Sequence, residues 1–269
     1  MKTLPKVAGQ VFRIAALVYG GVALFAWVAA DKLIFQPQPA SYGAQLPGLH
    51  MIAATDGTPL AVMHLPNAAA RHTLFYFHGN AEDLGDSWPL LQQWQAAGFA
   101  VPAFDYRGYG RSEGRPTEKN IYADTQAVVA FARTKLGLTP GQMIAVGRSV
   151  GSGPAVELAT HSPLAGLVLV SPMASAFRVM TRVKMLPFDQ FDNLAKAARV
   201  RCPTLVFHGV ADEVIAFTHG RNLYAALPDP KRSVWLDRAK HNDIWRIAGG
   251  EILREIGVFA GSLAAPRDR

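Results

Sequence analysis

The sequence of 269 residues contains a single cysteine, Cys202. One cysteine excludes an internal disulfide framework, and it excludes structural zinc and iron–sulfur sites built from several cysteines. Lysine and arginine outnumber aspartate and glutamate by 27 to 20, but the excess is not gathered into a basic block. Nucleic-acid binding is therefore not indicated. The 24 glycines and 18 prolines follow no period, which excludes collagen-like and low-complexity chains.

No acidic residue precedes Asp31, and the run Ile14–Ala30 carries no charge at all. Its 17 residues are near the lower length limit for a membrane-spanning helix. We therefore expect a transmembrane anchor at 14–30, preceded by a basic flank at 1–13. Positive charge concentrates before the run, which predicts a single-pass protein with a cytoplasmic N-terminus. The rest of the chain would then lie outside the cytoplasm, in the periplasm if the source is bacterial.

Two alternatives to the anchor stay open. A cleaved signal peptide is one, because Val28-Ala29-Ala30 is an acceptable small-residue cleavage site. A helix buried in the core of a soluble protein is the other.

The remainder of the chain alternates short apolar strands with helices. Residues 31–48 form an irregular, proline-containing linker, and a hairpin around Asp56-Gly57 opens a single domain at 49–269. The later strands are apolar on both faces, as in a parallel sheet covered by helices on each side. The sequence therefore predicts an α/β fold with a mostly parallel central sheet. We expect its strands at 51–55, 60–65, 73–77, 99–104, 143–146, 167–170, 204–207 and 233–236.

A helical insertion at 172–200 breaks this alternation before the penultimate strand. It is rich in methionine and phenylalanine and also carries arginine and lysine. Two interpretations are compatible: the insertion packs a small core of its own, or it is a lid over an apolar substrate site. On the second interpretation, Phe177, Met180 and Phe188 are the candidate substrate-binding residues.

The segment Gly147-Arg-Ser-Val-Gly151 matches the nucleophile-elbow pattern G-x-S-x-G, with a strand expected before it and a helix after it. The sharp turn leaves room only for very small residues two positions to either side of the serine, which explains both glycines. A phosphate-binding loop is excluded because no Gly-Lys-Ser/Thr follows, and a dinucleotide-binding turn is excluded because its third glycine is missing. The sequence therefore predicts Ser149 as a nucleophile.

A serine nucleophile needs a general base and an acid that orients the base, in the chain order Ser, Asp, His for this architecture. His241 follows the last strand and is the predicted base, whereas His219 falls inside a helix at 218–226 and is expected to be structural. Asp212 follows the strand at 204–207 and is the predicted acid. Asp237 is the alternative acid, and Asp243 is expected to cap the last helix.

The tetrahedral intermediate also needs backbone N–H groups aimed at its negative oxygen. One donor is expected from Val150, the residue after the nucleophile. The other is expected from the loop after the strand at 73–77, with Asn80 as the preferred donor and Ala81 as the alternative. His78 in the same loop is expected to be a buried structural group.

These motifs resemble the α/β-hydrolase superfamily, and within it the membrane-anchored serine hydrolases related to protein-depalmitoylating thioesterases and lysophospholipid lipases. The resemblance implies Ser149, Asp212 and His241 as nucleophile, acid and base, and it implies no cofactor. One departure is Lys240, where such proteins often have glycine. The matching stretches run in order along the chain: Phe77-His-Gly-Asn-Ala81, Phe104-Asp-Tyr-Arg-Gly-Tyr-Gly-Arg-Ser112, Gly147-Arg-Ser-Val-Gly-Ser-Gly-Pro-Ala155, Phe191-Asp-Asn193, His208-Gly-Val-Ala-Asp-Glu-Val214 and His241-Asn-Asp243.

The sequence therefore predicts a membrane-anchored serine hydrolase that cleaves carboxylic ester or thioester bonds of small acyl or lipid-like substrates through an acyl-enzyme. A serine peptidase of the same fold is an alternative, but we find no clear acidic pair to bind a peptide amino terminus. A catalytically inactive membrane scaffold is a third interpretation. The sequence leaves the oligomeric state open.

Overall fold

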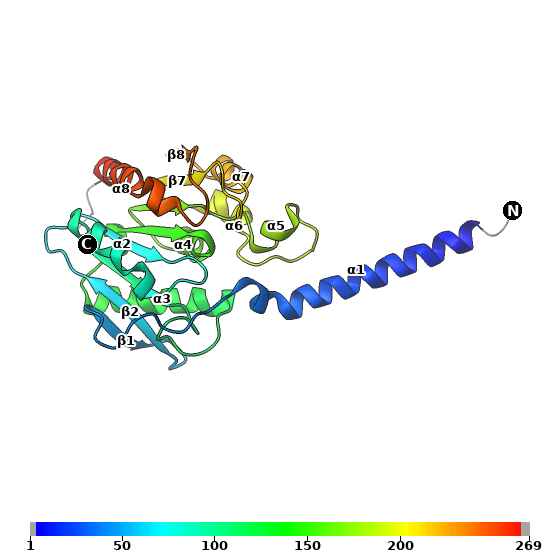
Figure 1. Cartoon of the computed structure of the whole chain (residues 1–269), viewed down its shortest axis with the longest axis horizontal. Coiled ribbons are helices and arrows are strands. Elements are labelled where there is room, and N and C mark those ends of the chain that lie inside the picture. Colours follow the sequence, from blue (N-terminus) through cyan, green and yellow to red (C-terminus); the bar gives the residue numbers. More distant parts are fainter. Residues whose placement is uncertain (1–3, 265–269) are drawn as a thin grey trace.

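A computed structural model describes residues 4–264 of the chain, and its centre is an eight-stranded mixed sheet (Figure 1). The strands lie in the order β1-β2-β4-β3-β5-β6-β7-β8. The pairs β1–β2 and β2–β4 are antiparallel, and all later pairs are parallel. This arrangement confirms the predicted fold class. The strands are β1 (Leu49–Ala53), β2 (Pro59–Leu65), β3 (Thr73–Phe77), β4 (Val101–Phe104), β5 (Met143–Arg148), β6 (Gly166–Val170), β7 (Thr204–Gly209) and β8 (Lys231–Leu236).

The register of the parallel strands sets where the functional loops meet. Phe77 at the end of β3 lies opposite Gly147 near the end of β5, and Gly209 at the end of β7 lies opposite Leu236 at the end of β8. Parallel strands present their carboxyl ends at one edge of a sheet. The loops after β3, β5, β7 and β8 therefore share that edge, as the sequence predicted for the nucleophile, acid, base and oxyanion residues.

Helices cover both faces of the sheet, each over its own core. One face packs against α2 (Leu84–Ala96) and α8 (Ile244–Ser262). The other packs against α3 (Glu118–Lys135), α4 (Ser152–His161) and α7 (Thr218–Ala226). Strands β3, β5 and β6 are buried along their whole length because they lie between these two layers. Single-turn 3₁₀ helices lie at Pro140–Gln142 and Ser149–Gly151.

The predicted helical insertion lies between β6 and β7. It contains α5 (Ala176–Thr181), α6 (Asn193–Lys196) and a 3₁₀ turn at Ala197–Arg199. Asp189 fixes the start of α5, because its carboxylate accepts hydrogen bonds from the Ser175 hydroxyl over 2.6 Å and from the Phe177 N–H over 3.0 Å. The insertion is therefore fixed at the start of α5. Residues 180–185, by contrast, are exposed.

Helix α1 (Leu4–Ile34) extends away from the domain as a rod (Figure 1). It is longer at both ends than the uncharged run at 14–30. Its apolar part, Val7–Ile34, has 28 residues and is long and apolar enough to cross a membrane. At 1.5 Å per residue it measures about 42 Å. None of its most apolar window is buried in the domain, which rules out the buried-helix alternative.

The segment after α1 is irregular, as expected of the linker, but it is not free of the domain. Phe35 is buried, and its ring meets that of Phe191 edge to face at 5.8 Å. Further along, the Ser41 N–H donates to the Asp83 carboxylate over 2.6 Å, and the Tyr42 hydroxyl bonds the carboxylate of Asp105. The linker is therefore packed against the domain and hydrogen-bonded to it. Sequence alone did not reveal this because each partner lies at least 40 residues away.

Candidate active site

Ser149 lies on the sharp turn between β5 and α4. Its φ of +53° is in the left-handed region, which a residue with a Cβ adopts only under strain. The two glycines of the elbow lie where no side chain fits. A Cβ on Gly147 would lie 2.6 Å from the carbonyl oxygen of Gly151, and a Cβ on Gly151 would collide with the carbonyl oxygen of Phe77. The strained turn and its two glycines thus have the geometry of a nucleophile elbow.

The structure brings Ser149, His241 and Asp212 into one hydrogen-bonded chain. The Ser149 Oγ lies 3.0 Å from His241 Nε2, and His241 Nδ1 lies 2.8 Å from the Asp212 carboxylate. With its ring proton on Nδ1, His241 donates to Asp212 and accepts from the serine hydroxyl. All three side chains are buried. This is the arrangement by which a base takes a proton from serine while a carboxylate holds the base in place.

Asp212 is held as a carboxylate by more than His241. Burial by itself raises the pKa of Asp212, but hydrogen bonds from His208 and His241 outweigh it and hold the pKa well below the usual range. The N–H groups of Val214 and Ile215 also donate to this carboxylate, over 3.0 and 2.7 Å. The sequence did not single out His208, which lies 3.4 Å from the Asp212 carboxylate.

The other candidate residues, Asp237, His219 and Asp243, are not hydrogen-bonded to Ser149, His241 or Asp212. Asp237, the alternative acid, is exposed, and the partner of His241 Nδ1 is Asp212. His219 is buried in α7, where its Nδ1 accepts from the Ala174 N–H over 3.1 Å. Asp243 stands at the start of α8, but its carboxylate accepts from the Lys240 N–H over 2.8 Å instead of capping the helix. Asp243 therefore occupies the N-cap position, as expected, but its side chain makes no capping hydrogen bond.

The predicted oxyanion residues flank the elbow. Val150 follows Ser149 directly, and Asn80 lies in the loop after β3. This loop runs close to the elbow, since a Cβ on Gly151 would lie 2.6 Å from the carbonyl oxygen of His78. Within residues 4–264 neither the backbone N–H of Asn80 nor that of Ala81, the alternative donor, makes a hydrogen bond, so both are free to donate to a ligand and Asn80 stays the preferred donor by prediction. The next residue, Ala81, has a φ of +57°, which is a strained conformation for alanine.

His78 is buried beneath this loop and is placed as a structural group. Its Nδ1 lies 2.8 Å from the carbonyl oxygen of Gly79, and its ring stacks on Tyr106 with centroids 4.1 Å apart. Burial lowers the pKa of His78 to about 4. A neutral ring that bonds its own loop fits the structural role that the sequence predicted.

Comparison with known proteins identifies the family of this chain. Human alpha/beta hydrolase domain-containing protein 17B is 38% identical over 200 residues, which cover 72% of this chain and 69% of the human protein. This chain belongs to the α/β-hydrolase family. The Caenorhabditis elegans protein aho-3, also an alpha/beta hydrolase domain-containing protein, is 41% identical over 186 residues, 67% of this chain and 54% of aho-3. The family model described as serine aminopeptidase, S33, matches residues 68–191 of this hydrolase.

Solved structures confirm the fold of this hydrolase. The Pyrococcus furiosus esterase Pf2001 superposes with a TM-score of 0.70 over 85% of this chain and 97% of the esterase, at 18% identity. An acetyl xylan esterase from Paenibacillus sp. R4 gives 0.66 over 83% of this chain and 87% of that chain, at 17% identity. At such low identity the likeness shows the fold alone.

Arg148, the residue before Ser149, contacts two of the loops at this site, and the sequence did not predict these contacts. Its buried guanidinium forms an ion pair with Glu82 and donates to the backbone carbonyl oxygen of His241 over 3.2 Å. Glu82 in turn accepts from the N–H of Gly79 over 2.9 Å. One buried cation therefore connects the end of β5, the loop after β8 that carries His241, and the loop after β3. The only signal in the sequence is a charged residue inside an otherwise apolar elbow.

Ser152 and Asn193 connect the elbow to the insertion. The Ser152 hydroxyl donates to the carbonyl oxygen of Ser149 over 2.6 Å. It accepts from the Asn193 side chain over 3.1 Å, and that same amide donates to the carbonyl oxygen of Met173 over 3.0 Å. These bonds hold the Phe191-Asp-Asn193 stretch against the elbow.

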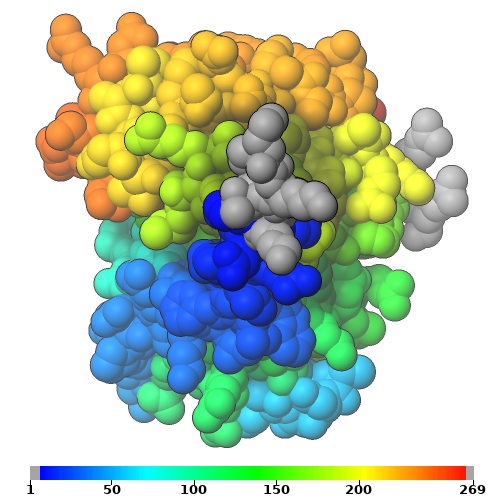
Figure 2. All heavy atoms as spheres, turned by 90° about the vertical axis from the view of Figure 1, so that its right-hand side faces the viewer, coloured from blue at the N-terminus to red at the C-terminus, as the bar shows by residue number. Residues whose placement is uncertain are grey.

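The three predicted substrate residues do not form one cluster. Phe177 and Phe188 are half-buried and pack edge to face at 5.9 Å, whereas Met180 is 85% exposed. The tip of the insertion instead approaches α1, since the Tyr19 hydroxyl donates to the carbonyl oxygen of Met185 over 2.9 Å. Figure 2, seen from the side on which α1 projects, shows the yellow-green insertion next to the blue helix. Met185 also lines an apolar groove of about 500 Å³ together with one face of α1.

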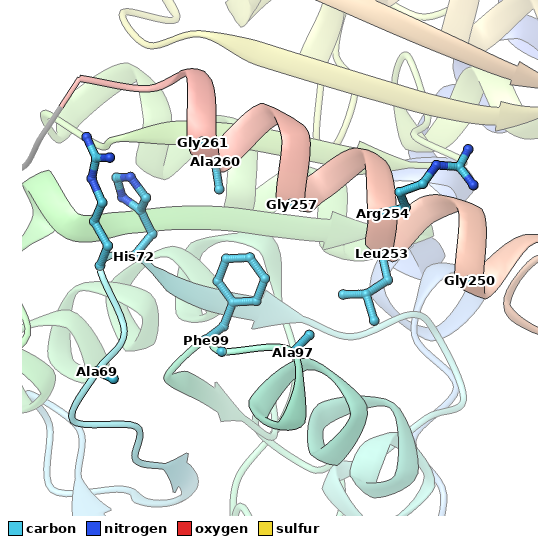
Figure 3. Close-up of a pocket in the computed structure, with 12 residues that line it drawn as sticks. Ala69, His72, Ala97, Phe99, Gly250, Leu253, Arg254, Gly257, Ala260 and Gly261 are labelled. Carbon is cyan, nitrogen blue, oxygen red and sulfur yellow. The ribbon is translucent and has the colours of Figure 1, made fainter.

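A second hollow, of about 640 Å³, lies beside α8 (Figure 3). His72 and Phe99, which precede β3 and β4, line it from one side, and Gly257 and Gly261 of α8 line it from the other. It therefore opens at the amino ends of the strands, opposite the edge that carries Ser149. Within residues 4–264, no group of three or more His, Cys, Asp or Glu side chains is arranged to hold a metal ion.

Proposed function

We propose that this protein is a serine hydrolase that cleaves carboxylic ester or thioester bonds through an acyl-enzyme on Ser149. The observation that carries the proposal is the chain of two hydrogen bonds, 3.0 and 2.8 Å long, from Ser149 through His241 to Asp212. It lies beside a loop whose Asn80 N–H has no partner among the described residues.

The proposed reaction has two halves. In the first, the Ser149 oxygen attacks the carbonyl carbon of the substrate while His241 Nε2 takes the hydroxyl proton, and the N–H groups of Asn80 and Val150 stabilise the resulting oxyanion. Collapse of this intermediate breaks the bond to the alcohol or thiol, which leaves with the proton from His241. In the second half, water attacks the acyl-serine by the same route and releases the carboxylic acid. Asp212 stays ionised throughout and orients His241.

We further propose an acyl or lipid-like substrate. Two features support it: the long apolar helix α1, and the groove that α1 forms with Met185 of the insertion. A hydrolase held at a bilayer meets acylated molecules at high local concentration. Phe177 and Phe188 of the insertion are the proposed contacts for an acyl chain, with Met180 at their exposed margin.

Helix α1 is proposed as an uncleaved single-pass anchor. Its exposed apolar side chains, such as Phe12, Leu17 and Trp27, need a covering that the domain does not provide. Positive charge before the apolar run supports a cytoplasmic N-terminus and an extracytoplasmic catalytic domain. Cleavage as a signal peptide is the competing outcome, since an apolar helix near the N-terminus fits both.

The likeness to the serine aminopeptidase family model keeps a peptidase as the second candidate. Glu82 and Asp83 are the acidic residues closest in sequence to the proposed oxyanion loop, and both already bind groups of the protein. Neither is therefore free to bind a peptide amino terminus. This disfavours the peptidase.

The test is turnover by the purified full-length chain in detergent. Wild type and Ser149→Ala are compared on p-nitrophenyl esters, acyl-thioesters and aminoacyl p-nitroanilides, and both are labelled with a fluorophosphonate probe. We expect ester or thioester hydrolysis and probe labelling that depend on Ser149. Turnover of the anilides alone would identify a peptidase, and absence of both turnover and labelling would identify an inactive scaffold.

A further inference from the structure

The side chain of Asn80 is bonded to the end of α1. Its Nδ2 donates to the carbonyl oxygen of Ile34, the last residue of α1, over 2.7 Å. Its Oδ1 accepts from the N–H of Gln36 over 3.0 Å and from the Tyr109 hydroxyl. The same hydroxyl accepts from the Gln36 N–H over 3.0 Å. A single amide therefore holds both the last carbonyl group of α1 and the residue that leaves the helix.

The end of α1 is itself fixed against the catalytic core. Phe35 is 4% exposed and packs on Phe191, whose ring fills the space beside Gly153 at the start of α4. One turn earlier, the carboxylate of Asp31 accepts from the side chain of Gln190 in the insertion over 3.1 Å. Movement of α1 relative to the domain must therefore disturb Phe35, and with it the partners of Asn80.

The same residue carries the N–H group assigned to the oxyanion. A side chain and a backbone N–H share one Cα, so a side chain fixed by three bonds limits the rotation of its own peptide. The neighbouring peptide needs such restraint, because Ala81 occupies the left-handed region, which is a strained conformation for alanine.

We propose that Asn80 is a positioning residue whose side chain couples the carboxyl end of α1 to the peptide that stabilises the oxyanion. The proposal rests on the proposed function, because it concerns the oxyanion hole of that reaction. It makes the docking of the apolar helix a condition of full activity. Loss of a whole oxyanion donor lowers kcat by about 10²–10³. A peptide that is loosened but still present should lose less, about tenfold, within that limit.

The experiment compares full-length Asn80→Ala with wild type, since alanine keeps the backbone N–H and removes only the side-chain bonds. The matched control is Asn67→Ala: that amide also ties a loop, through Ala69 and Gln95, but at the amino end of β3. The measurements are kcat and KM for p-nitrophenyl butyrate, the thermal unfolding midpoint, and the inhibition constant of a trifluoromethyl ketone. This inhibitor forms a tetrahedral adduct with serine, so its oxygen occupies the oxyanion hole.

We expect Asn80→Ala to lower kcat about tenfold with KM nearly unchanged, and to weaken the ketone by the same factor. Asn67→Ala should change neither. A double-mutant cycle with Phe35→Leu tests the link to α1: Phe35→Leu should lower kcat in wild type and have little further effect in Asn80→Ala, because both act through one network.

Two results would overturn the proposal while leaving the function intact. One is an Asn80→Ala variant with wild-type kcat and ketone affinity, and the other is full additivity of the Phe35 and Asn80 changes. If Asn80→Ala does not fold, Tyr109→Phe decides, because it removes one bond to the amide and keeps the ring; unchanged kcat and ketone affinity there would overturn the proposal. A wild-type protein without Ser149-dependent hydrolysis would instead refute the proposed function itself.

Discussion

The guanidinium of Arg148 donates a hydrogen bond to the backbone carbonyl oxygen of His241 over 3.2 Å. Through its ion pair with Glu82 it is also connected to the loop that carries Asn80. Replacing Arg148 with glutamine should therefore displace the proposed base relative to the nucleophile. Displacements of about 1 Å can cost on the order of 10²-fold in rate. We expect kcat to fall by about 10- to 100-fold with a smaller change in KM.

The control for this prediction is Arg246→Gln. Arg246 is also near the His241 loop, but its side chain is 73% exposed and bonds only Asp243 among the described residues. Its replacement should leave kcat unchanged. Equal activity of the Arg148 and Arg246 variants would show that the buried contact does not position His241.

These contacts mark the limit of what the sequence revealed. The strand at 73–77 and the helix at 218–226 were predicted to the residue. The strand is a short apolar run, and the helix buries residues at helical spacing, His219, Gly220 and Leu223; both are local patterns. Ser149, Asp212 and His241 could be proposed from the sequence because each follows a strand at the same edge of a sheet. Arg148 carried no such signal, because its partners Glu82 and His241 lie 66 and 93 residues away in the chain.

The linker shows the same limit more strongly. Its prolines and polar residues predicted irregular structure over 31–48. Residues 35–48 adopt it, whereas residues 31–34 are the last residues of α1. Nothing in the local composition indicated that Gln36 bonds Asn80 or that Phe35 enters the core. Such contacts arise only when the sheet has brought the loop after β3 beside the end of α1.

Asp212→Asn should impair catalysis far more than Asp237→Asn. The first change leaves His241 without the carboxylate that orients it, and comparable replacements lower kcat by about 10⁴. Asp237 is exposed and should tolerate the change. The measurement is kcat/KM for both variants at neutral pH, with circular dichroism as a check on folding. A severe defect in Asp237→Asn with an active Asp212→Asn would reverse the assignment of the acid.

The buried carboxyl of Asp105 should make stability depend on pH. Burial raises its pKa to about 7 although the Tyr42 hydroxyl and the Leu84 N–H bond the carboxylate, and the charge of Asp83 raises it further. The folded state therefore binds a proton more tightly than the unfolded state, whose pKa is near 3.8. It follows that stability due to Asp105 is present below about pH 4 and is lost as pH rises toward 7.

Asp105→Asn removes this dependence. The quantity to follow is the unfolding midpoint of wild type minus that of the variant. We expect this difference to decrease as the pH rises from 4 to 7 and to stay constant above that. The difference is the quantity to measure because neighbouring His78, whose pKa is lowered to about 4, contributes the opposite slope in both proteins. A difference that does not change with pH would contradict the raised pKa.

The protein should fractionate with membranes and resist extraction by alkaline carbonate. Residues Val7–Ile34 supply 28 residues of apolar helix, and a spanning helix needs about 20. Intact mass should include the whole N-terminal segment. A mature chain that begins near Asp31 would show cleavage, and it would also lack the part of α1 that carries Tyr19, the partner of Met185.

The last prediction concerns acyl-chain length. If Phe177 and Phe188 line an acyl site, each methylene of a longer ester should gain at most about 0.8 kcal/mol, or roughly fourfold in kcat/KM. The gain should stop where the site ends. Phe177→Ser or Phe188→Ser should flatten this trend while acetyl ester turnover stays similar, because the proposed triad lies on other loops. Both rings are half-buried against each other at 5.9 Å, so each variant needs its unfolding midpoint measured as a check.

Met180 supplies the internal comparison within the same insertion. Its side chain is 85% exposed, so Met180→Ser should cost little stability. For water-soluble esters, Met180→Ser should alter the dependence of activity on acyl-chain length less than Phe177→Ser or Phe188→Ser does. The reason is that an exposed side chain buries little of a bound acyl group. If wild-type activity instead falls steadily from acetyl to octanoyl esters, the insertion does not bind acyl chains. Helix α1 would then be the remaining support for a lipid-like substrate, and the proposed ester chemistry at Ser149 would be unaffected.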